Sequence, residues 1–363
     1  MHYWQILFIP RYHEMQLLVS LLFILLQMLP MPEDITLLFA GDAMQHGPQI
    51  AAAKRSSGKY DYSKCFEYVK PAVSSADYAV VNLECPLAGK PYTGYPCFSA
   101  PDDYAEALKD AGFDMFLVAN NHALDKRDKG AHRTIDKLSE LEIPSVGLYH
   151  DKEHRLAASP FVATIGDFRV AFVGYTYGTN GIGVQGNLVV NYINADSISH
   201  DIVRARKLGA ELVCVLLHWG VEYAMTPNFR QKELTELLID AGADMIIGGH
   251  PHVVQPFEMR FNPRTGRNVL VVYSLGNFLS NQNDTNSRGG AMVNVVISRQ
   301  GTQAYIKSAS YDLVFVQKPT YQLIPAWMPE LVGKSSQSAF ETFCKNARRL
   351  FSRYNVAVSE STH

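Results

Sequence analysis

The sequence predicts an α/β fold, and three observations support this prediction. Apolar runs of strand length alternate along the chain with segments in which apolar residues recur with helical period. The 363 residues are 47% hydrophobic and 19% charged, which is the composition of a globular protein. Several of the strand-like runs end in aspartate, glutamate, asparagine or histidine. A chain of this length suits one large α/β domain with extensions, or two smaller domains.

Charge and cysteine content narrow the range of functions. The formal net charge is −2, so no nucleic-acid partner is expected, because such a partner would require a local basic patch. The five cysteines include no Cys-X-X-Cys pair, which argues against a zinc knuckle or a thioredoxin-type site. Cys85 and Cys97 flank a loop rich in proline, glycine and tyrosine. They either pair in an oxidising compartment or remain two free thiols.

The first thirty residues differ from the rest of the chain. The run from Met15 to Leu29 is mostly apolar, but it is short for a membrane span, which needs roughly 20 residues. Its length suits the apolar region of a signal peptide or a marginal anchor, and a buried core helix is the alternative. We predict that residues 1–32 are a signal peptide or membrane anchor. The protein is therefore expected in the cell envelope, either exported or membrane-anchored.

Three predicted strands in the first half of the chain lead into side chains that can bind metals. These strands span residues 35–40, 78–83 and 113–119, and they are followed by Asp42, by Glu84 and by Asn121-His122. Helices are predicted around them at residues 66–75, 101–111 and 130–141. Ligand sites in open α/β sheets lie outside the carboxyl ends of strands, so these side chains are candidates for a site. Helix capping and turn formation are the alternative roles.

The second half repeats this arrangement. A predicted strand over residues 211–217 ends in His218, and another over 243–247 ends in two glycines followed by His250-Pro-His252. Two imidazoles two residues apart in a tight turn can converge on one point, and imidazole is the commonest metal ligand. A hairpin crosses Gly166-Asp167, and a glycine-rich loop over residues 176–186 is expected near the mouth of the site. The remaining predictions are helices at 196–208, 228–241 and 340–354 and strands at 269–273, 291–298 and 304–313.

Together these strand-end groups predict a metal site. Mixed oxygen and nitrogen ligands suit Zn, Mn, Fe or a similar divalent metal and not a thiolate cluster. The groups outnumber the ligands that one tetrahedral zinc needs, and they fit a two-metal site with one bridging carboxylate. A histidine beside such a site that is not a ligand could protonate a leaving oxygen.

Six motifs give the sequence a recognisable family pattern. They are Gly41-Asp42-Ala43-Met44, Asn82-Leu83-Glu84, Ala119-Asn120-Asn121-His122-Ala123-Leu124-Asp125, His218-Trp219-Gly220, Gly249-His250-Pro251-His252-Val253-Val254-Gln255-Pro256 and Tyr273-Ser274-Leu275-Gly276-Asn277-Phe278. With these motifs the sequence resembles the CapA family, named for poly-γ-glutamate capsule synthesis, a branch of the calcineurin-like metallophosphoesterases. The resemblance implies a four-layer α/β/β/α sandwich with the site at the ends of the central strands.

The resemblance also implies roles for individual residues. The implied metal ligands are Asp42, Glu84, Asn121, His218, His250 and His252, with Glu84 as the bridging carboxylate and His122 as the catalytic histidine. One position departs from the classical pattern, because Met44 stands where a ligand histidine is usual. His46 lies two residues further on and is a candidate substitute. The implied cofactors are therefore one or two divalent ions.

The function implied by the resemblance is that of a metal-dependent, hydrolase-like protein of capsule polymer synthesis. Residues 33–315 are the expected CapA-like domain, and residues 316–363 are a C-terminal extension with a helix. The expected partners are an anionic polymer or phosphoester substrate and membrane-bound capsule synthesis proteins. Lys90, Lys126, Arg127 and Lys129 lie near two motifs, where they either contact a polyanion or are ordinary solvated charges. The alternative function is that of a non-catalytic accessory protein in polymer assembly or anchoring.

Overall fold

The computed structural model describes residues 34–363, and the predicted signal peptide or anchor of residues 1–32 lies outside the described residues. Residues Ile35–His363 form one compact unit. No helix between residues 34 and 363 combines the length and the hydropathy that crossing a membrane requires.

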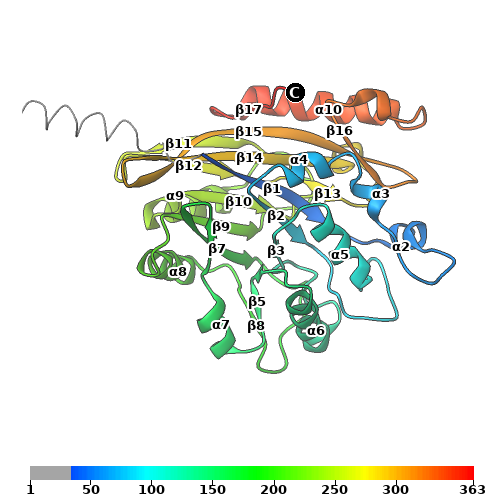
Figure 1. The fold of residues 1–363 in the computed structure, drawn as a ribbon, viewed down its shortest axis with the longest axis horizontal. Helices are drawn as coiled ribbons and strands as arrows, with labels where there is room; N and C mark the ends of the chain where they lie inside the picture. Colours follow the sequence, from blue (N-terminus) through cyan, green and yellow to red (C-terminus); the bar gives the residue numbers. More distant parts are fainter. Residues whose placement is uncertain (1–33) are drawn as a thin grey trace, which may run out of the picture. The chain divides into compact units, whose positions relative to one another are not determined.

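Two mixed β-sheets carry the fold (Figure 1). The first has the order β16-β15-β14-β1-β2-β3-β4, with β13 beside β1 and β17 beside β15. Its strands are β1 (Ile35–Ala43), β2 (Tyr78–Leu83), β3 (Met115–Leu117), β4 (Ser145–Val146), β13 (Asn277–Leu279), β14 (Gly289–Gln300), β15 (Gln303–Gln317), β16 (Gln322–Pro325) and β17 (Ser359–Glu360). Strands β1 to β4 run parallel, so their carboxyl ends lie at one edge of the sheet.

The second sheet has the order β11-β12-β10-β9-β7-β6. Its strands are β6 (Phe161–Ile165), β7 (Phe168–Thr176), β9 (Leu212–His218), β10 (Met245–Gly249), β11 (Phe257–Asn262) and β12 (Arg267–Val272). Strands β7, β9, β10 and β12 run parallel to one another, whereas the edge strands β6 and β11 pair antiparallel with β7 and β12. A separate short pair joins β5 (Leu148–Tyr149) to β8 (Val189–Val190).

Alternation along the central strands explains why the two sheets stack. In β1, Leu37 and Phe39 enter the core between the sheets, whereas Leu38 and Ala40 enter the core on the outer face. In β7, Val170 and Phe172 alternate with residues of the opposite outer core in the same way. Side chains of a strand point alternately to its two faces, so a strand covered on both faces is apolar along its length.

Helices cover both outer faces of the sheet pair. The outer core of the first sheet includes side chains from α3 (Ser63–Phe66), α4 (Lys70–Ser74), α5 (Asp102–Asp110) and α6 (Arg127–Glu140). That of the second sheet includes side chains from α8 (Ala195–Lys207) and α9 (Phe229–Ala241). The remaining helices are α2 (Gly47–Ala53), α7 (Lys152–Ala158), α10 (Gln337–Tyr354) and the short 3-10 turns η1 (Thr285–Ser287) and η2 (Pro329–Leu331). The predicted α/β class is therefore confirmed, with layers in the order helix, sheet, sheet, helix.

The C-terminal helix contributes to the central core. In Figure 1, α10 lies along the long strand β15. Its Phe351 ring lies 4.5 Å from the Tyr311 ring of β15 and 4.6 Å from the Phe257 ring of β11. Beyond the helix, the Val356 N–H donates to the Phe257 carbonyl at 3.0 Å. This segment thus extends the apolar core between the sheets.

Some predicted element boundaries differ from the structure. The single helix predicted over residues 66–75 is instead two short helices, α3 and α4. Pro71 lies in the first turn of α4, a position that tolerates its missing N–H, whereas in mid-helix it would interrupt the hydrogen-bond ladder. The strand predicted over 113–119 is shorter, at Met115–Leu117.

Candidate metal centre

The predicted ligands meet at the carboxyl ends of the central strands. Asp42 lies near the end of β1, and Glu84 follows β2 directly. His218 ends β9, and His250 follows β10 directly. The side chains form two buried groups in which all candidate ligand atoms lie within 4.8 Å of one another: Asp42 with Glu84 and His218, and Glu84 with His250 and His252. Glu84 belongs to both groups, as a bridging carboxylate would.

Asp42 is held from three directions. A bulge in the β1–β2 pairing follows Ala40 and places Asp42 opposite Asn82. The Asn82 amide donates to Asp42 Oδ1 at 2.7 Å, and the His250 backbone N–H donates to Oδ2 at 3.1 Å. His252 Nδ1 also lies 3.1 Å from Oδ2. Burial alone would raise the pKa of Asp42, but the hydrogen bond and charge of His252 outweigh it and lower the pKa to about 2.

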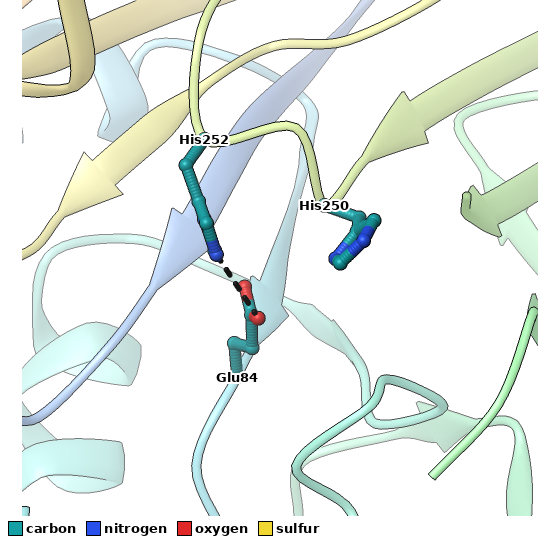
Figure 2. A group of neighbouring side chains, drawn as sticks. All are labelled: Glu84, His250 and His252. Carbon is teal, nitrogen blue, oxygen red and sulfur yellow. Dashed lines mark ion pairs between the residues drawn. The ribbon is translucent and has the colours of Figure 1, made fainter. Parts of the chain in front are cut away.

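The turn after β10 aims two imidazoles at one place. His250 and His252 have φ values of 94° and 57°, a region that residues with side chains rarely adopt and that costs about 1–3 kcal/mol. The bond from the His250 N–H to Asp42 and the contact of His252 Nδ1 with Asn277 Oδ1, at 3.1 Å, hold this conformation. Figure 2 shows both imidazoles leaving the turn on the side where Glu84 lies. This strained turn therefore places the imidazole rings of His250 and His252 close together.

Glu84 is a fully buried carboxylate without a hydrogen-bond partner on either oxygen among residues 34–363. Its Oε1 lies 3.5 Å from His218 Nε2. The same oxygen lies 3.8 Å from His252 Nε2, an ion pair that Figure 2 marks with a dashed line. Burial raises the pKa of Glu84 well above its usual range. His250 Nδ1 is likewise buried without a partner. Such unpaired groups are costly, and a divalent cation is the partner that this set of oxygen and nitrogen atoms fits.

Electrostatics distinguish the three histidines. Burial lowers the pKa of His218 to about 3 and that of His250 to about 2, so both imidazoles are neutral, which is the form that binds metals. Burial also disfavours the charged form of His252, but the negative charges of Glu84 and Asp42 outweigh burial and raise its pKa to about 9. Without metal, the positive charge of His252 thus offsets part of the negative charge of Asp42 and Glu84.

Asn121 joins the same cluster through its amide. Its Oδ1 lies 2.8 Å from His218 Nε2, and the other nitrogen of that ring, Nδ1, lies 3.2 Å from the Asn82 amide. The Asn121 amide also donates to Asn180 Oδ1 at 3.4 Å, which connects the cluster to the glycine-rich loop. In that loop the Tyr177 ring lies 4.5 Å from the His250 ring. The loop predicted near the mouth of the site does border it.

His122 lies beside the cluster and belongs to neither ligand group. Its Nδ1 lies 2.9 Å from Asp125 Oδ2, which also accepts the Phe98 backbone N–H at 2.7 Å. The Phe98 ring packs edge-on against the His122 ring, with centroids 4.6 Å apart. Burial lowers the pKa of His122, but the Asp125 hydrogen bond and the charge of Glu84 outweigh burial and raise it. His122 is thus oriented through Nδ1, with Nε2 available for proton transfer.

The position of the missing ligand histidine is not refilled. Met44 is buried, and neither ligand group includes His46. The His46 ring bonds to Gln49 Oε1 at 3.0 Å at the start of α2, and it packs against Phe98 with centroids 5.2 Å apart. Burial lowers its pKa to about 4. In this structure His46 therefore organises the end of β1 and is not a ligand in either group.

The sequence left two further questions open, the state of Cys85 and Cys97 and the role of the basic residues. Cys85 and Cys97 are both free thiols, and Cys97 Sγ donates to the Asp125 carbonyl at 2.8 Å. Of the basic residues considered for polyanion binding, Lys126 and Arg127 lie at the start of α6. Their contact with a polymer remains a prediction.

Three supporting residues were not singled out from the sequence. They are Asn82, which bonds Asp42, Asp125, which orients His122, and Asn277, which contacts His252. All three stand within the quoted motifs, so the motifs contained the signal. Their roles became visible only with the bonds between segments that are far apart in sequence.

Two solved structures are similar to this chain over much of its length. Haemophilus influenzae NAD nucleotidase NadN is 14% identical, with a TM-score of 0.49 over 91% of this chain and 57% of that chain. The calcineurin-like phosphoesterase YfkN from Bacillus subtilis is 12% identical, with a TM-score of 0.45 over 87% of this chain and 99% of that chain.

Sequence relatives are more similar. The chain is 30% identical to the capsule biosynthesis protein CapA of Bacillus anthracis over 281 residues, which are 74% of this chain and 66% of the relative. It is 30% identical to the PGA biosynthesis protein CapA of Bacillus subtilis over 276 residues, which are 73% of this chain and 68% of the relative. It is 25% identical over 206 residues to a probable polyglutamine synthesis accessory protein of Mycobacterium tuberculosis, covering 51% of this chain and 52% of the relative. The family described as bacterial capsule synthesis protein PGA_cap matches residues 36–282. The chain therefore belongs to the PGA_cap family of bacterial capsule synthesis proteins.

Proposed function

We propose that this protein is a metal-dependent hydrolase of the cell envelope that acts on an amide-linked capsule polymer or on a phosphoester. The observation that carries the proposal is the environment of Glu84. Its carboxylate is buried, lacks hydrogen-bond partners among the described residues, and lies between the imidazoles of His218 and His252. A buried carboxylate that accepts no hydrogen bond is costly to the fold, and a divalent cation held with these imidazoles would offset that cost.

The metal-holding residues are the two groups that share Glu84. They would hold one or two divalent ions, of which Zn, Mn and Fe suit mixed oxygen and nitrogen ligands. The members of these groups are Asp42, Glu84, His218, His250 and His252, and Asn121, whose Oδ1 contacts His218, is a further proposed ligand. A divalent metal bound there supplies Lewis-acid chemistry and an activated water for attack on an ester or amide.

The chain itself supplies proton transfer and orientation. Asp125 binds His122 through Nδ1 and leaves Nε2 to give a proton to the leaving oxygen or nitrogen. The raised pKa of His122 favours its protonated form, as a general acid requires. The Tyr177 ring lies tilted against the His250 ring, with centroids 4.5 Å apart, and so borders the same place.

A non-catalytic accessory role in polymer assembly is the second candidate. One observation favours it: the usual ligand histidine is replaced by Met44, which is buried, and His46 joins neither ligand group. The family assignment supports work on a capsule polymer in either case, and membrane-bound synthesis proteins are the proposed partners. The basic residues Lys90, Lys126, Arg127 and Lys129 are proposed contacts for an anionic polymer.

Hydrolysis of a chromogenic phosphodiester and of γ-linked glutamate oligomers by metal-loaded protein tests the proposal. Activity with bound metal supports the hydrolase. Bound metal with no activity on either substrate class supports the accessory role. If the protein has the accessory role, His122→Ala should affect only the packing around residue 122 and leave every other measured property unchanged.

A further inference from the structure

Two tyrosines with large exposed surfaces lie beside the metal centre. Tyr177 directly follows β7 and is 47% exposed, and Tyr223 lies in the turn after β9 and is 51% exposed. The Tyr177 ring lies 4.5 Å from the His250 ring, and the Tyr223 ring lies 6.3 Å from the His252 ring. Each phenol thus borders one of the two imidazoles that follow β10, and both are accessible from solvent.

The backbone of Tyr223 is strained in a way that fixes its position. Its φ of 63° lies in the left-handed region, which costs a bulky residue about 1–3 kcal/mol. The Tyr223 N–H donates to the carbonyl of Pro251 at 2.8 Å, and Pro251 stands between His250 and His252 in the chain. The turn after β9 is therefore tied to the turn that carries the two histidines. Strained residues cluster at ligand-binding sites, so this conformation indicates a role for Tyr223 at the centre.

The phenol oxygen of Tyr223 is held by an amide whose orientation is determined. The Asn277 amide nitrogen donates to the Ser287 carbonyl and to Gln282 Oε1, both at 2.8 Å. Because a backbone carbonyl can only accept, Asn277 must present its N–H groups on this side, and Gln282 must turn its oxygen toward them. The nitrogen of Gln282 is then the atom that faces Tyr223, and it donates to the phenol oxygen at 3.3 Å.

Tyr177 is held in a similar way by a residue of the cluster. Its phenol is in hydrogen-bond contact with the side chain of Asn121. The Asn121 oxygen is already engaged by His218 Nε2 at 2.8 Å, so the amide nitrogen is the atom left for the phenol. Both phenol oxygens therefore act as acceptors. Neither phenol hydrogen has an acceptor among residues 34–363, and each remains free for donation to a ligand.

We propose that Tyr177 and Tyr223 are substrate-binding residues, whose two phenol O–H groups donate to oxygen atoms of a substrate group held at the metal centre. The assignment of a substrate to this centre rests on the proposed function. Two separate donors match a phosphoryl group, which presents several oxygens, better than an amide, which presents one carbonyl oxygen. The two tyrosines therefore favour a phosphoester among the proposed substrates. Hydrogen bonds to a charged oxygen are the stronger kind, so both donors should contribute to affinity.

Binding of inorganic phosphate to protein loaded with Mn and freed of excess metal tests this role by calorimetry. The variants are Tyr177→Phe, Tyr223→Phe and the double variant, which remove the hydroxyls and keep the rings. Tyr354→Phe is the matched control, because Tyr354 is a 39% exposed tyrosine at the end of α10. We expect each single variant to raise the dissociation constant of phosphate about fivefold or more, and the double variant about 25-fold or more. Tyr354→Phe should change it less than about twofold.

Manganese affinity of the same variants separates binding of the ligand from organisation of the cluster. Both tyrosine variants should bind Mn within about twofold of the wild type, because neither residue belongs to a ligand group. Unchanged phosphate affinity in the double variant would overturn the proposal, as would a loss of Mn affinity as large as the loss of phosphate affinity. Absence of phosphate binding by Mn-loaded wild type at millimolar phosphate would also overturn it.

Phosphate binding requires no turnover, so this test is independent of hydrolysis. A protein that shows the expected pattern of phosphate affinities but hydrolyses neither substrate class would refute the hydrolase and keep Tyr177 and Tyr223 as binding residues. Hydrolysis of a phosphodiester that is equally fast, at equal Michaelis constant, in the wild type and the double variant would keep the hydrolase and refute the role of the two phenols.

Discussion

Replacing Glu84 by glutamine should change the response of the protein to metal more than any other single substitution. Glu84 is the residue shared by both ligand groups, and its two oxygens are buried without partners among the described residues. Glutamine keeps the shape of the side chain but removes the negative charge and half of its acceptor capacity. The variant should therefore lose affinity for divalent metal at both groups at once.

The size of the effect follows from binding linkage. A metal present at 100 times its dissociation constant stabilises the folded state by about 2.7 kcal/mol. With an unfolding entropy of about 2.1 cal/mol/K per residue, this raises the melting temperature of a unit of this size by about 4 °C. The wild-type protein should show this rise with Zn or Mn, and Glu84→Gln should show little of it. Without metal, the variant should be at least as stable as the wild type, because a neutral amide replaces a buried carboxylate that accepts no hydrogen bond, and this gain outweighs the loss of the contact with His252.

Differential scanning fluorimetry with and without metal measures both effects, and calorimetry gives the affinity. Glu222→Gln is the matched control, because it removes an exposed carboxylate near the cluster that belongs to neither ligand group. Equal metal-induced shifts in wild type and Glu84→Gln would refute the reasoning. A lower melting temperature of metal-free Glu84→Gln would show that the carboxylate has a stabilising partner within the chain.

Three further predictions follow from the same geometry. His122→Ala should retain metal and lose hydrolysis by about 10²–10⁴-fold, measured as turnover of a chromogenic phosphodiester, and retained turnover would remove His122 as the acid. Gly249→Ala should destabilise the fold by about 1–3 kcal/mol in urea unfolding and weaken metal binding, because the added Cβ would lie 2.6 Å from Asp42 Oδ1. Gly183→Ala is the control, because its added Cβ would meet open space, and it should change neither the stability nor the metal affinity. Burial lowers the pKa of Lys318 to about 8, whereas a lysine in the unfolded chain has a pKa of about 10.4. Between these two pH values the unfolded state binds more protons, so the free energy of unfolding should rise with pH relative to that of Lys318→Gln. Parallel curves of unfolding free energy against pH for the two proteins would contradict this prediction.

The sequence predicted the position of the site because strand ends are readable from pattern. Asp42, Glu84, His218 and His250 each stand at or just beyond the end of an apolar run, and parallel strands bring such ends to one edge. That two stacked sheets bring the ends of their central strands to one site was implied by family resemblance and not by periodicity. The structure confirms that the predicted groups converge.

The parts that sequence reasoning missed depend on contacts between distant segments. Asn82 reads as an ordinary residue of a buried strand, yet a bulge in β1 places it against Asp42. His46 was considered as a ligand because of its spacing, but its ring is engaged by Gln49. Neither the bulge nor the direction of a ring has a signature in the spacing of residues.

Packing also decided features that local patterns left open. The sequence predicts a C-terminal extension that contains a helix with a basic, solvated end. In the structure Phe351 of this helix packs on Tyr311 and Phe257 in the central core, and α10 lies within the compact unit. Amphipathicity identifies an apolar face but not the surface that the face will cover.

Elemental analysis of protein purified without chelator tests the central claim most directly. The claim is that the strand-end cluster around Glu84 holds divalent metal. It predicts one or two equivalents of Zn, Mn or Fe per chain in the wild type, and a clear loss of metal in Glu84→Gln at unchanged folding. Absence of metal in the wild type, even after loading with these ions, would contradict the claim.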